Sequence, residues 1–493
     1  FKQKTAYEIR LSLVGSEMCI RDRYPCLAKE PFYHRSSIFN KKKKEPTSWL
    51  PLTHLIAVDA SLDILQKVLQ LYPMAIQQTT AGNDKQQSQP TFPLHIACRF
   101  ASDETIHFLA DAYPEALLME SHDLGYPLHC LLHRNEVLAH KGQKSSNGPL
   151  LNKLKFVLDL CPDVLSTSKS VDKILELAIQ KQLDLECLEY ILGQIPSGVD
   201  ELNLVEQEGG KPWYFGYYQV QMIANNLFPR LTKLTCNVKH WGKDGLLVFL
   251  QSLPLAENLK HLQLALPDDV HLKHFHGEEI LKALQEAFTR LPLLVEIQLS
   301  LFNRLQGIME EEDHKWDHDQ ILVATTNALV VADDHQHSQL QHLVLQNFRL
   351  SSSETLSTLF TNGAAPRKLD LVDVSLEEGT WKSVPQAWGA CRVQNLSIFG
   401  RQPQTKWLHL FLMELRKAVH LKSLSLGFTH PMDTPAKQMS EPSVLDPPED
   451  KPSHPDDHKP DLTMIPLMKL LEDSTLEKLR VKGAIAGLDD VVL

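Results

Sequence analysis

The residues with the clearest potential for chemistry are histidines that lie close to carboxylates. Asp313, His314, Asp317, His318 and Asp319 place two histidines four residues apart. That spacing can bind a metal ion from one face of a helix. We nevertheless expect a solvated, charged loop here, because so acidic a stretch does not favour a helix and the sequence fixes no third ligand.

Two other histidine groups carry less weight. His271, His274 and His276 follow a predicted strand, and His454 and His458 lie in a stretch rich in proline and aspartate. We assign a metal ion to neither group.

A run of four lysines, 41–44, precedes Glu45 and Pro46. Such runs can serve nuclear import or nucleic-acid binding. We favour a solvated leader, since a single tetralysine is a weak signal.

The sequence contains no nucleophile elbow, Walker loop, GxGxxG, HExxH or kinase signature. We therefore predict that the protein is not an enzyme, with no catalytic residue, no cofactor and no metal site.

Length and charge narrow the class of protein. A chain of 493 residues is expected to hold two or more domains or a repeat array, and a hydrophobic fraction of 43% is enough for packed cores. The formal net charge of −11 argues against global binding to nucleic acid or to an anionic membrane. The chain has no run of 18 apolar residues, so we predict no transmembrane helix.

The first 23 residues are set apart from the rest. KQKTAYEI at 2–9 and SLVGSEMCIRDR at 12–23 resemble the translation of sequencing-adapter DNA, so we exclude residues 1–23 from the fold. Residues 24–48 are predicted to be a basic leader.

The remaining seven cysteines include no CxxC pair and sit mostly in apolar segments. They predict buried thiols in a reducing compartment, the cytoplasm, with the nucleus as the alternative.

Residues 49–200 contain a repeated unit of two helices. Each unit opens with Pro-Leu at Pro51, Pro93 or Pro127 and closes with an apolar helix before Pro73, Pro114, Pro162 or Pro196. Proline suits the first turn of a helix and the position just after its end. PLHIA at 93–97 and DLGYPLH at 123–129 resemble the ankyrin repeat, in which the histidine stabilises the turn between repeats. The resemblance implies an all-α array of helical hairpins, and a generic helical-hairpin solenoid is the alternative.

A different pattern begins near residue 227. L-x-x-L-x-L recurs eight times, with central positions at Leu234, Leu262, Ile297, Leu343, Leu369, Leu396, Leu424 and Leu479. A base spacing near 27 residues with three insertions accounts for the intervals. The pattern resembles the long leucine-rich repeat, in which a helix follows each strand. The resemblance implies an α/β solenoid with parallel strands over 227–493, so the whole fold class is a repeat solenoid.

The remaining segments complete the domain organisation. Residues 201–226 are expected to join the two arrays. Residues 303–320 and 430–461 are expected to be loop insertions, the second one disordered because it is rich in proline and aspartate.

Positions two, three and five of L-x-x-L-x-L, together with position seven just after it, are expected to face a concave binding surface. Eight basic residues stand there against three acidic ones, Glu296, Asp370 and Glu477, on a chain that is acidic overall. This reversal predicts a protein partner that presents an acidic segment. The candidate partner-binding residues are Lys233, Lys260, His261, Gln298, His342, Arg367, Lys368, Gln394, Lys422 and Arg480.

The function we predict is an intracellular scaffold or adaptor that binds proteins through two repeat arrays. A regulatory or sensor subunit of a larger assembly is one alternative. A metal-dependent enzyme that uses the His/Asp loop is the other.

Overall fold

The computed structural model divides the chain into two compact units, 1–227 and 228–493. It describes residues 32–34, 47–78, 91–121, 125–133, 148–180, 183–205, 216–238, 243–266, 277–301, 318–335, 340–350, 366–376, 392–401, 411–413, 415, 418–429, 476–483 and 491–492. Residues 1–23, and the leader 24–48 apart from 32–34 and 47–48, lie outside these ranges.

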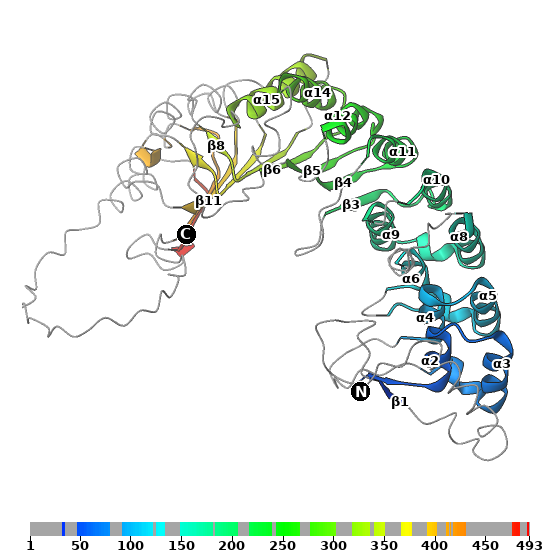
Figure 1. Cartoon of the computed structure of the whole chain (residues 1–493). Coiled ribbons are helices and arrows are strands. Elements are labelled where there is room, and N and C mark those ends of the chain that lie inside the picture. Colours follow the sequence, from blue (N-terminus) through cyan, green and yellow to red (C-terminus); the bar gives the residue numbers. More distant parts are fainter. Residues whose placement is uncertain are drawn as a thin grey trace, which may run out of the picture. The chain divides into compact units, whose positions relative to one another are not determined.

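Unit 1 is built mainly of paired helices (Figure 1). The first helices of the pairs, α2, α4, α6 and α9, contact one another in succession. The second helices, α3, α5 and α8, each contact the first helix of their own pair, and α10 contacts α8. Their bounds are α2 Pro51–Ala57, α3 Leu62–Leu71, α4 Pro93–Phe100, α5 Asp103–Ala112, α6 Pro127–Leu132, α8 Gly148–Leu160, α9 Ser168–Gln180 and α10 Leu185–Gln194.

Prolines set the boundaries of these helices. Helices α2, α4 and α6 begin at the three prolines of the Pro-Leu openers. Three of the four closing prolines begin short 3-10 turns, η2 (Pro73–Ile76), η3 (Pro114–Leu118) and η4 (Pro162–Leu165). Proline fits both places because its ring presets φ and the first turn needs no N–H bond.

Two histidines of the Pro-Leu-His openers are buried in unit 1. His95 is fully buried and its Nε2 lies 2.9 Å from the Met119 carbonyl oxygen, so Nε2 donates. The Nδ1 atom of His129 accepts the Tyr126 N–H at 3.1 Å. Burial is the main cause that lowers the pKa of His95 to about 4 and that of His129 to about 3. Both rings are therefore neutral near pH 7.

The described cysteines are also buried. Cys98, Cys130, Cys161, Cys187 and Cys236 are free thiols, as predicted from their apolar surroundings.

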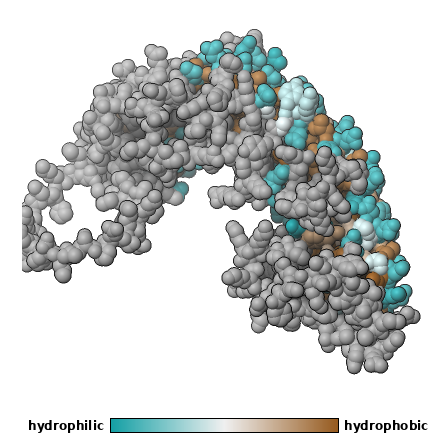
Figure 2. Space-filling view, viewed as in Figure 1, coloured by the Kyte–Doolittle hydropathy of each residue, from teal (hydrophilic) through white to brown (hydrophobic). Residues whose placement is uncertain are grey.

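Several large apolar side chains of unit 1 remain exposed. Leu71, Met74, Leu118 and Leu160 lie at or just after the ends of second helices. Figure 2 shows apolar areas interspersed with hydrophilic ones along the helices of this unit.

The segment 201–226 has structure of its own. It contains strand β3 (Glu201–Leu204), which contacts α9, and most of α11 (Tyr217–Leu227), which contacts α10. Strands β1 (Phe32–His34) and β2 (Thr47–Trp49) form a short antiparallel pair near the start of the chain.

Unit 2 holds a parallel sheet in which every L-x-x-L-x-L segment forms one strand. Each strand pairs in parallel with the next in the order β4, β5, β6, β7, β9, β11, β12, β13. The bounds are β4 Lys233–Asn237, β5 His261–Leu266, β6 Glu296–Leu301, β7 His342–Gln346, β9 Lys368–Val372, β11 Asn395–Arg401, β12 Ser423–Thr429 and β13 Lys478–Gly483. The α/β arrangement with parallel strands agrees with the predicted class of unit 2.

The register aligns the apolar positions into two rows. Leu234 pairs with Leu262, Leu262 with Ile297, and the row continues through every strand to Leu479. These central residues are at most 2% exposed. Since alternate residues of a strand point to opposite faces, the residues between them lie on the other face of the sheet.

Helices follow the first strands of the sheet and lie along one side of it (Figure 1). These are α12 (Lys243–Ser252), α14 (Gly277–Thr289) and α15 (His318–His335), and each follows a strand. Residues 351–365, 377–391 and most of 402–417, which follow the later strands, lie outside the described residues.

One predicted boundary is wrong. Helix α15 begins at His318, inside the predicted loop 303–320. Acidic residues near a helix N-terminus are favourable, so the acidity of Asp319 does not exclude a helix there. The rest of that insertion and all of 430–461 lie outside the described residues.

The strand exits use left-handed backbone. Asn347 and Asp373, one residue beyond β7 and β9, have φ of 61° and 51°. Their N–H groups donate to Val372 and Phe399 on the neighbouring strands at 2.9 and 2.7 Å. Asparagine and aspartate tolerate this conformation better than other side chains. Beyond these exits, β8 (Arg349–Leu350) and β10 (Ser375–Leu376) form a second short parallel ribbon.

At the last edge, β14 (Val491–Val492) pairs antiparallel with β13. Among the described residues, no helix combines the length and apolar character needed to cross a membrane.

Candidate binding surface

The face of the unit 2 sheet opposite the leucine rows carries polar side chains. We call it the open face and define it by the third and fifth residues of each L-x-x-L-x-L segment. Its third-position row reads Lys233, His261, Glu296, His342, Lys368, Asn395, Ser423 and Lys478, aligned by the strand register.

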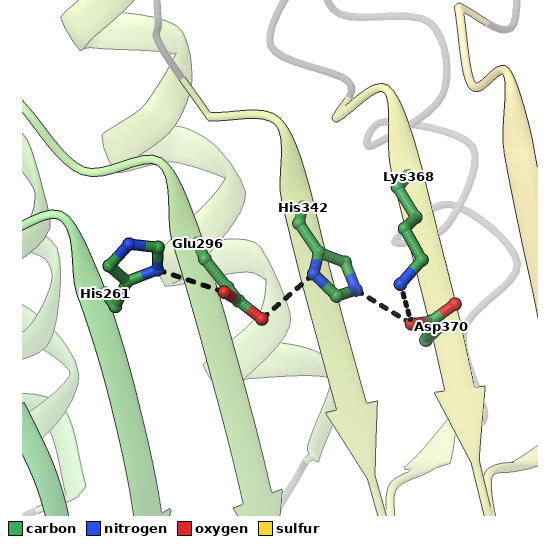
Figure 3. Close-up of polar contacts among 5 residues, drawn as sticks. All are labelled: His261, Glu296, His342, Lys368 and Asp370. Carbon is green, nitrogen blue, oxygen red and sulfur yellow. Dashed lines mark hydrogen bonds and ion pairs between the residues drawn. The ribbon is translucent and has the colours of Figure 1, made fainter. Parts of the chain in front are cut away.

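Five charged or titratable side chains on this face form a continuous chain of contacts across β5, β6, β7 and β9 (Figure 3). We call them the His-carboxylate ladder: His261, Glu296, His342, Asp370 and Lys368. His261 Nδ1 lies 3.0 Å from Glu296 Oε2, and His342 Nδ1 lies 2.9 Å from Glu296 Oε1. The other nitrogen of His342, Nε2, lies 2.7 Å from Asp370 Oδ2, which also contacts Lys368 Nζ at 2.9 Å.

The ladder forms because neighbouring strands bring these residues into register. Glu296 pairs with His261 on one side and with His342 on the other, and His342 pairs with Lys368. Asp370 lies two residues beyond Lys368 on the same face of β9. Side chains at adjacent register positions are close enough to interact.

His342 lies between the two carboxylates of the ladder. Its Nε2 forms a hydrogen bond with Asp370 Oδ2 at 2.7 Å, and its Nδ1 lies 2.9 Å from Glu296 Oε1. The ladder therefore holds two carboxylates beside one lysine and two histidines.

The Asp370 carboxylate is the most enclosed group of the ladder. Its side chain is 16% exposed, compared with 47% for His261. Burial by itself would raise the pKa of Asp370, but hydrogen bonds from Lys368, Ser397 and His342 outweigh it and hold the pKa below its ordinary value. Asp370 is thus ionised near pH 7.

Six of the ten predicted partner-binding residues lie on the open face. The third-position row contains Lys233, His261, His342 and Lys368, and the fifth-position row contains Gln298 and Arg480. The other four, Lys260, Arg367, Gln394 and Lys422, directly precede β5, β9, β11 and β12 and are not part of these two rows. Backbone hydrogen bonds link Lys422 to Gln394 and Gln394 to Arg367.

Ion pairs reduce the positive charge expected for this surface. Lys368 contacts Asp370 at 2.9 Å, and Lys422 contacts Glu477 at 3.5 Å. The count of basic residues in the sequence includes both lysines as charges available to a partner, but each of them is already paired within the protein. Writing the eight segments in register would have found both the pairs and the ladder, since it places Glu296 beside His261 and His342.

Most of the other histidines and the lysine run considered in the sequence lie outside the part of the chain that the structure describes. His271, His274, His276, His314, His454 and His458 lie outside the described residues, as do Lys41–Lys44. Within the part of the chain that the structure describes, no group of three or more histidine, cysteine, aspartate or glutamate side chains is arranged to hold a metal ion.

Comparison with known proteins gives no relative: the chain matches no protein-family model and no curated protein sequence.

Proposed function

We propose that the protein is a non-catalytic scaffold or adaptor, and that the open face of unit 2 is its main protein-binding surface. The observation that carries this proposal is the His-carboxylate ladder. It displays a defined pattern of charge across four strands, with side chains that are 16–47% exposed. Rigid, closely spaced polar groups of this kind give an interface its specificity and orientation.

The inner members of the ladder, His342 and Asp370, are poorly suited to catalysis. A general base needs a nitrogen or oxygen that can reach a substrate proton. His342 commits both ring nitrogens to carboxylates, and Asp370 Oδ2 already accepts two contacts. A binding role uses the same groups without displacing any of them.

We further propose that the two units are ankyrin-like and leucine-rich-repeat-like arrays. The proline-initiated helix pairs of unit 1 support the first assignment, and the in-register L-x-x-L-x-L strands of unit 2 support the second. Stacked repeats present extended surfaces. The exposed apolar side chains at the ends of the second helices would add contacts in unit 1.

The cytoplasm, or alternatively the nucleus, is the location we propose, because the described cysteines are free and buried. A regulatory or sensor subunit remains the second candidate function.

Partner capture with substituted full-length chains tests the proposal. Gln263→Tyr combined with Gln298→Tyr places two bulky rings on the open face, where Gln263 is exposed and Gln298 half-buried. The matched control is Gln251→Tyr, the same change at an exposed position of α12 on the helix side. Proteins crosslinked to the chain in native lysate are then identified by mass spectrometry.

We expect the open-face variant to lose specific partners that the control retains. Equal sets of crosslinked partners from both variants would reject the open face as the binding surface. Thermal melts of all three chains check that each remains folded.

A further inference from the structure

Beyond the ladder, the basic charge of the open face is concentrated on β13. Lys478 and Arg480 are both exposed, and neither has an ion-pair partner among the described residues. Lys368 and Lys422, by contrast, are paired with Asp370 and Glu477. The β13 edge therefore carries two neighbouring cations, whereas the opposite edge, β4, carries the single exposed Lys233.

The next two strands of the sheet, β12 and β11, carry small polar side chains at the third and fifth positions of their segments, and Phe399 lies two residues beyond Ser397 on β11. We call Asn395, Ser397, Ser423 and Ser425 the serine rows. Ser423 pairs with Lys478 and Ser425 with Arg480, while Asn395 and Ser397 pair with the two serines from the other side. The serine rows add no charge, and their hydroxyl and amide groups can both donate and accept hydrogen bonds.

Beyond the serine rows the surface meets the ladder. Asn395 pairs with Lys368 and Ser397 with Asp370. The carboxylates of the ladder are engaged by His261, His342 and Lys368. The open face thus has the ladder on β5–β9 and a cationic edge on β13, with uncharged third- and fifth-position side chains on the strands between them.

We propose that the β11–β13 part of the open face binds an extended acidic peptide segment. The carboxylates of the segment would pair with Lys478 and Arg480, and its backbone groups would hydrogen-bond to the serine rows. This inference rests on the proposed binding function and names the chemistry of the partner.

The spacing of the two basic residues fits an extended ligand. Lys478 and Arg480 are two residues apart on one strand, so they point to the same face about 7 Å apart. An extended peptide has the same period, and carboxylates at alternate positions would face both cations. A peptide is favoured over nucleic acid, because the net charge of −11 repels a long polyanion.

Fluorescence anisotropy of the full chain with a labelled peptide of four Glu-Ser repeats tests the proposal. In the reversal variant, Lys478→Glu and Arg480→Glu, we expect affinity to fall at least about fivefold, since two attractions become repulsions. The matched control, Lys282→Glu and Arg290→Glu, makes the same two changes at exposed positions in and just after α14. It should retain nearly all of the affinity.

A neutral variant keeps the test decisive if the reversal unfolds the protein. Lys478→Gln with Arg480→Gln removes the attraction without adding repulsion, and we expect a smaller loss in the same direction. A peptide of four Gln-Ser repeats should bind none of the chains detectably.

Two results would overturn the proposal. One is equal peptide affinity for the wild type and the two β13 variants, or an equal loss in the α14 control. The other is tighter binding of an eight-nucleotide thymidylate strand that depends on Lys478 and Arg480, which would assign the edge to nucleic acid. If partner capture still depends on Gln263 and Gln298, the scaffold function stands while the acidic-peptide chemistry fails.

Discussion

Protonation of the two buried histidines of unit 1 should destabilise it as the pH falls. His95 and His129 have folded-state pKa values of about 4 and about 3, against 6.5 for the unperturbed group. Between these values the unfolded chain binds protons that the folded chain does not. The linkage relation then requires the free energy of unfolding to decrease as the pH falls below 6.5.

The size of the effect follows from the pKa values. Lowering the pH from 7.5 to 5.0 should remove about 2 kcal/mol per histidine, or about 4 kcal/mol together. Asp172 acts in the opposite direction, because burial raises its pKa from 3.8 to about 6. Its carboxylate is partly exposed, so we discount its gain to less than about 1 kcal/mol. The net loss should be about 3 kcal/mol.

Hydrogen exchange of the full chain, followed by mass spectrometry, measures this loss locally. Peptides that cover α4 and α6 should lose about a hundredfold in protection between pH 7.5 and 5.0, after correction for the intrinsic pH dependence of exchange. Replacing both histidines (His95→Gln, His129→Gln) should lower protection at pH 7.5, because it removes buried hydrogen bonds. The same variant should not lose further protection at pH 5.0.

A control separates this effect from general acid sensitivity. His107→Gln replaces an exposed histidine of α5 and should keep the full decrease. If the double variant loses as much protection on acidification as the wild type does, protonation of His95 and His129 is not the cause and the argument from burial is wrong.

Three substitutions in unit 2 or on its face give further predictions. Gly427→Ala should destabilise the protein by about 1–3 kcal/mol in urea denaturation, because the added Cβ would lie 2.5 Å from the Phe399 ring. The control Gly193→Ala should not destabilise it, because no atom lies within 4 Å of the added Cβ. Leu343→Ala, at a fully buried central position, should cost about 2–5 kcal/mol by the same assay, and a cost below about 1 kcal/mol would contradict the packed row. Asp370→Asn removes a carboxylate from the ladder and should tighten binding of the Glu-Ser peptide about two- to fivefold; weaker binding would contradict this electrostatic argument.

The sequence predicts the strands of unit 2 well because two periodicities agree. Within each segment, residues two apart share a face, and between segments the repeat places equivalent leucines beside each other. The eight strands are therefore found by inspection of L-x-x-L-x-L alone. The starts of α2, α4 and α6 are equally predictable, because proline is confined to the first turn of a helix.

The charge pattern of the open face was harder to predict. Net charge can be counted residue by residue, but a contact between two side chains depends on the register of their strands. The paired residues Ile297 and Leu343 are 46 residues apart in sequence, and Leu343 and Leu369 are 26 residues apart. The rotamers that place His342 between two carboxylates depend on packing against both neighbours, which composition does not determine. The start of α15 falls inside the predicted loop for a similar reason. The acidity of a segment argues against a helix on average, but acidic side chains are favourable in the first turn of a helix.

The order of strands in unit 2 also determines how that unit responds to mechanical force. Among the described strands of this sheet, each one from β4 to β13 is hydrogen-bonded to the sheet strands next to it in sequence order, with β8 and β10 set apart in their own ribbon. A force that pulls β4 away from β13 across the sheet therefore acts on each pair of neighbouring strands in turn. The backbone hydrogen bonds between the strands then break one strand pair at a time. The His-carboxylate ladder joins four neighbouring strands of the sheet through their side chains, in addition to the backbone hydrogen bonds. The strand pairs that separate at the lowest force should therefore lie outside β5–β9. Extension would then begin near the edges, with the central strands separating last.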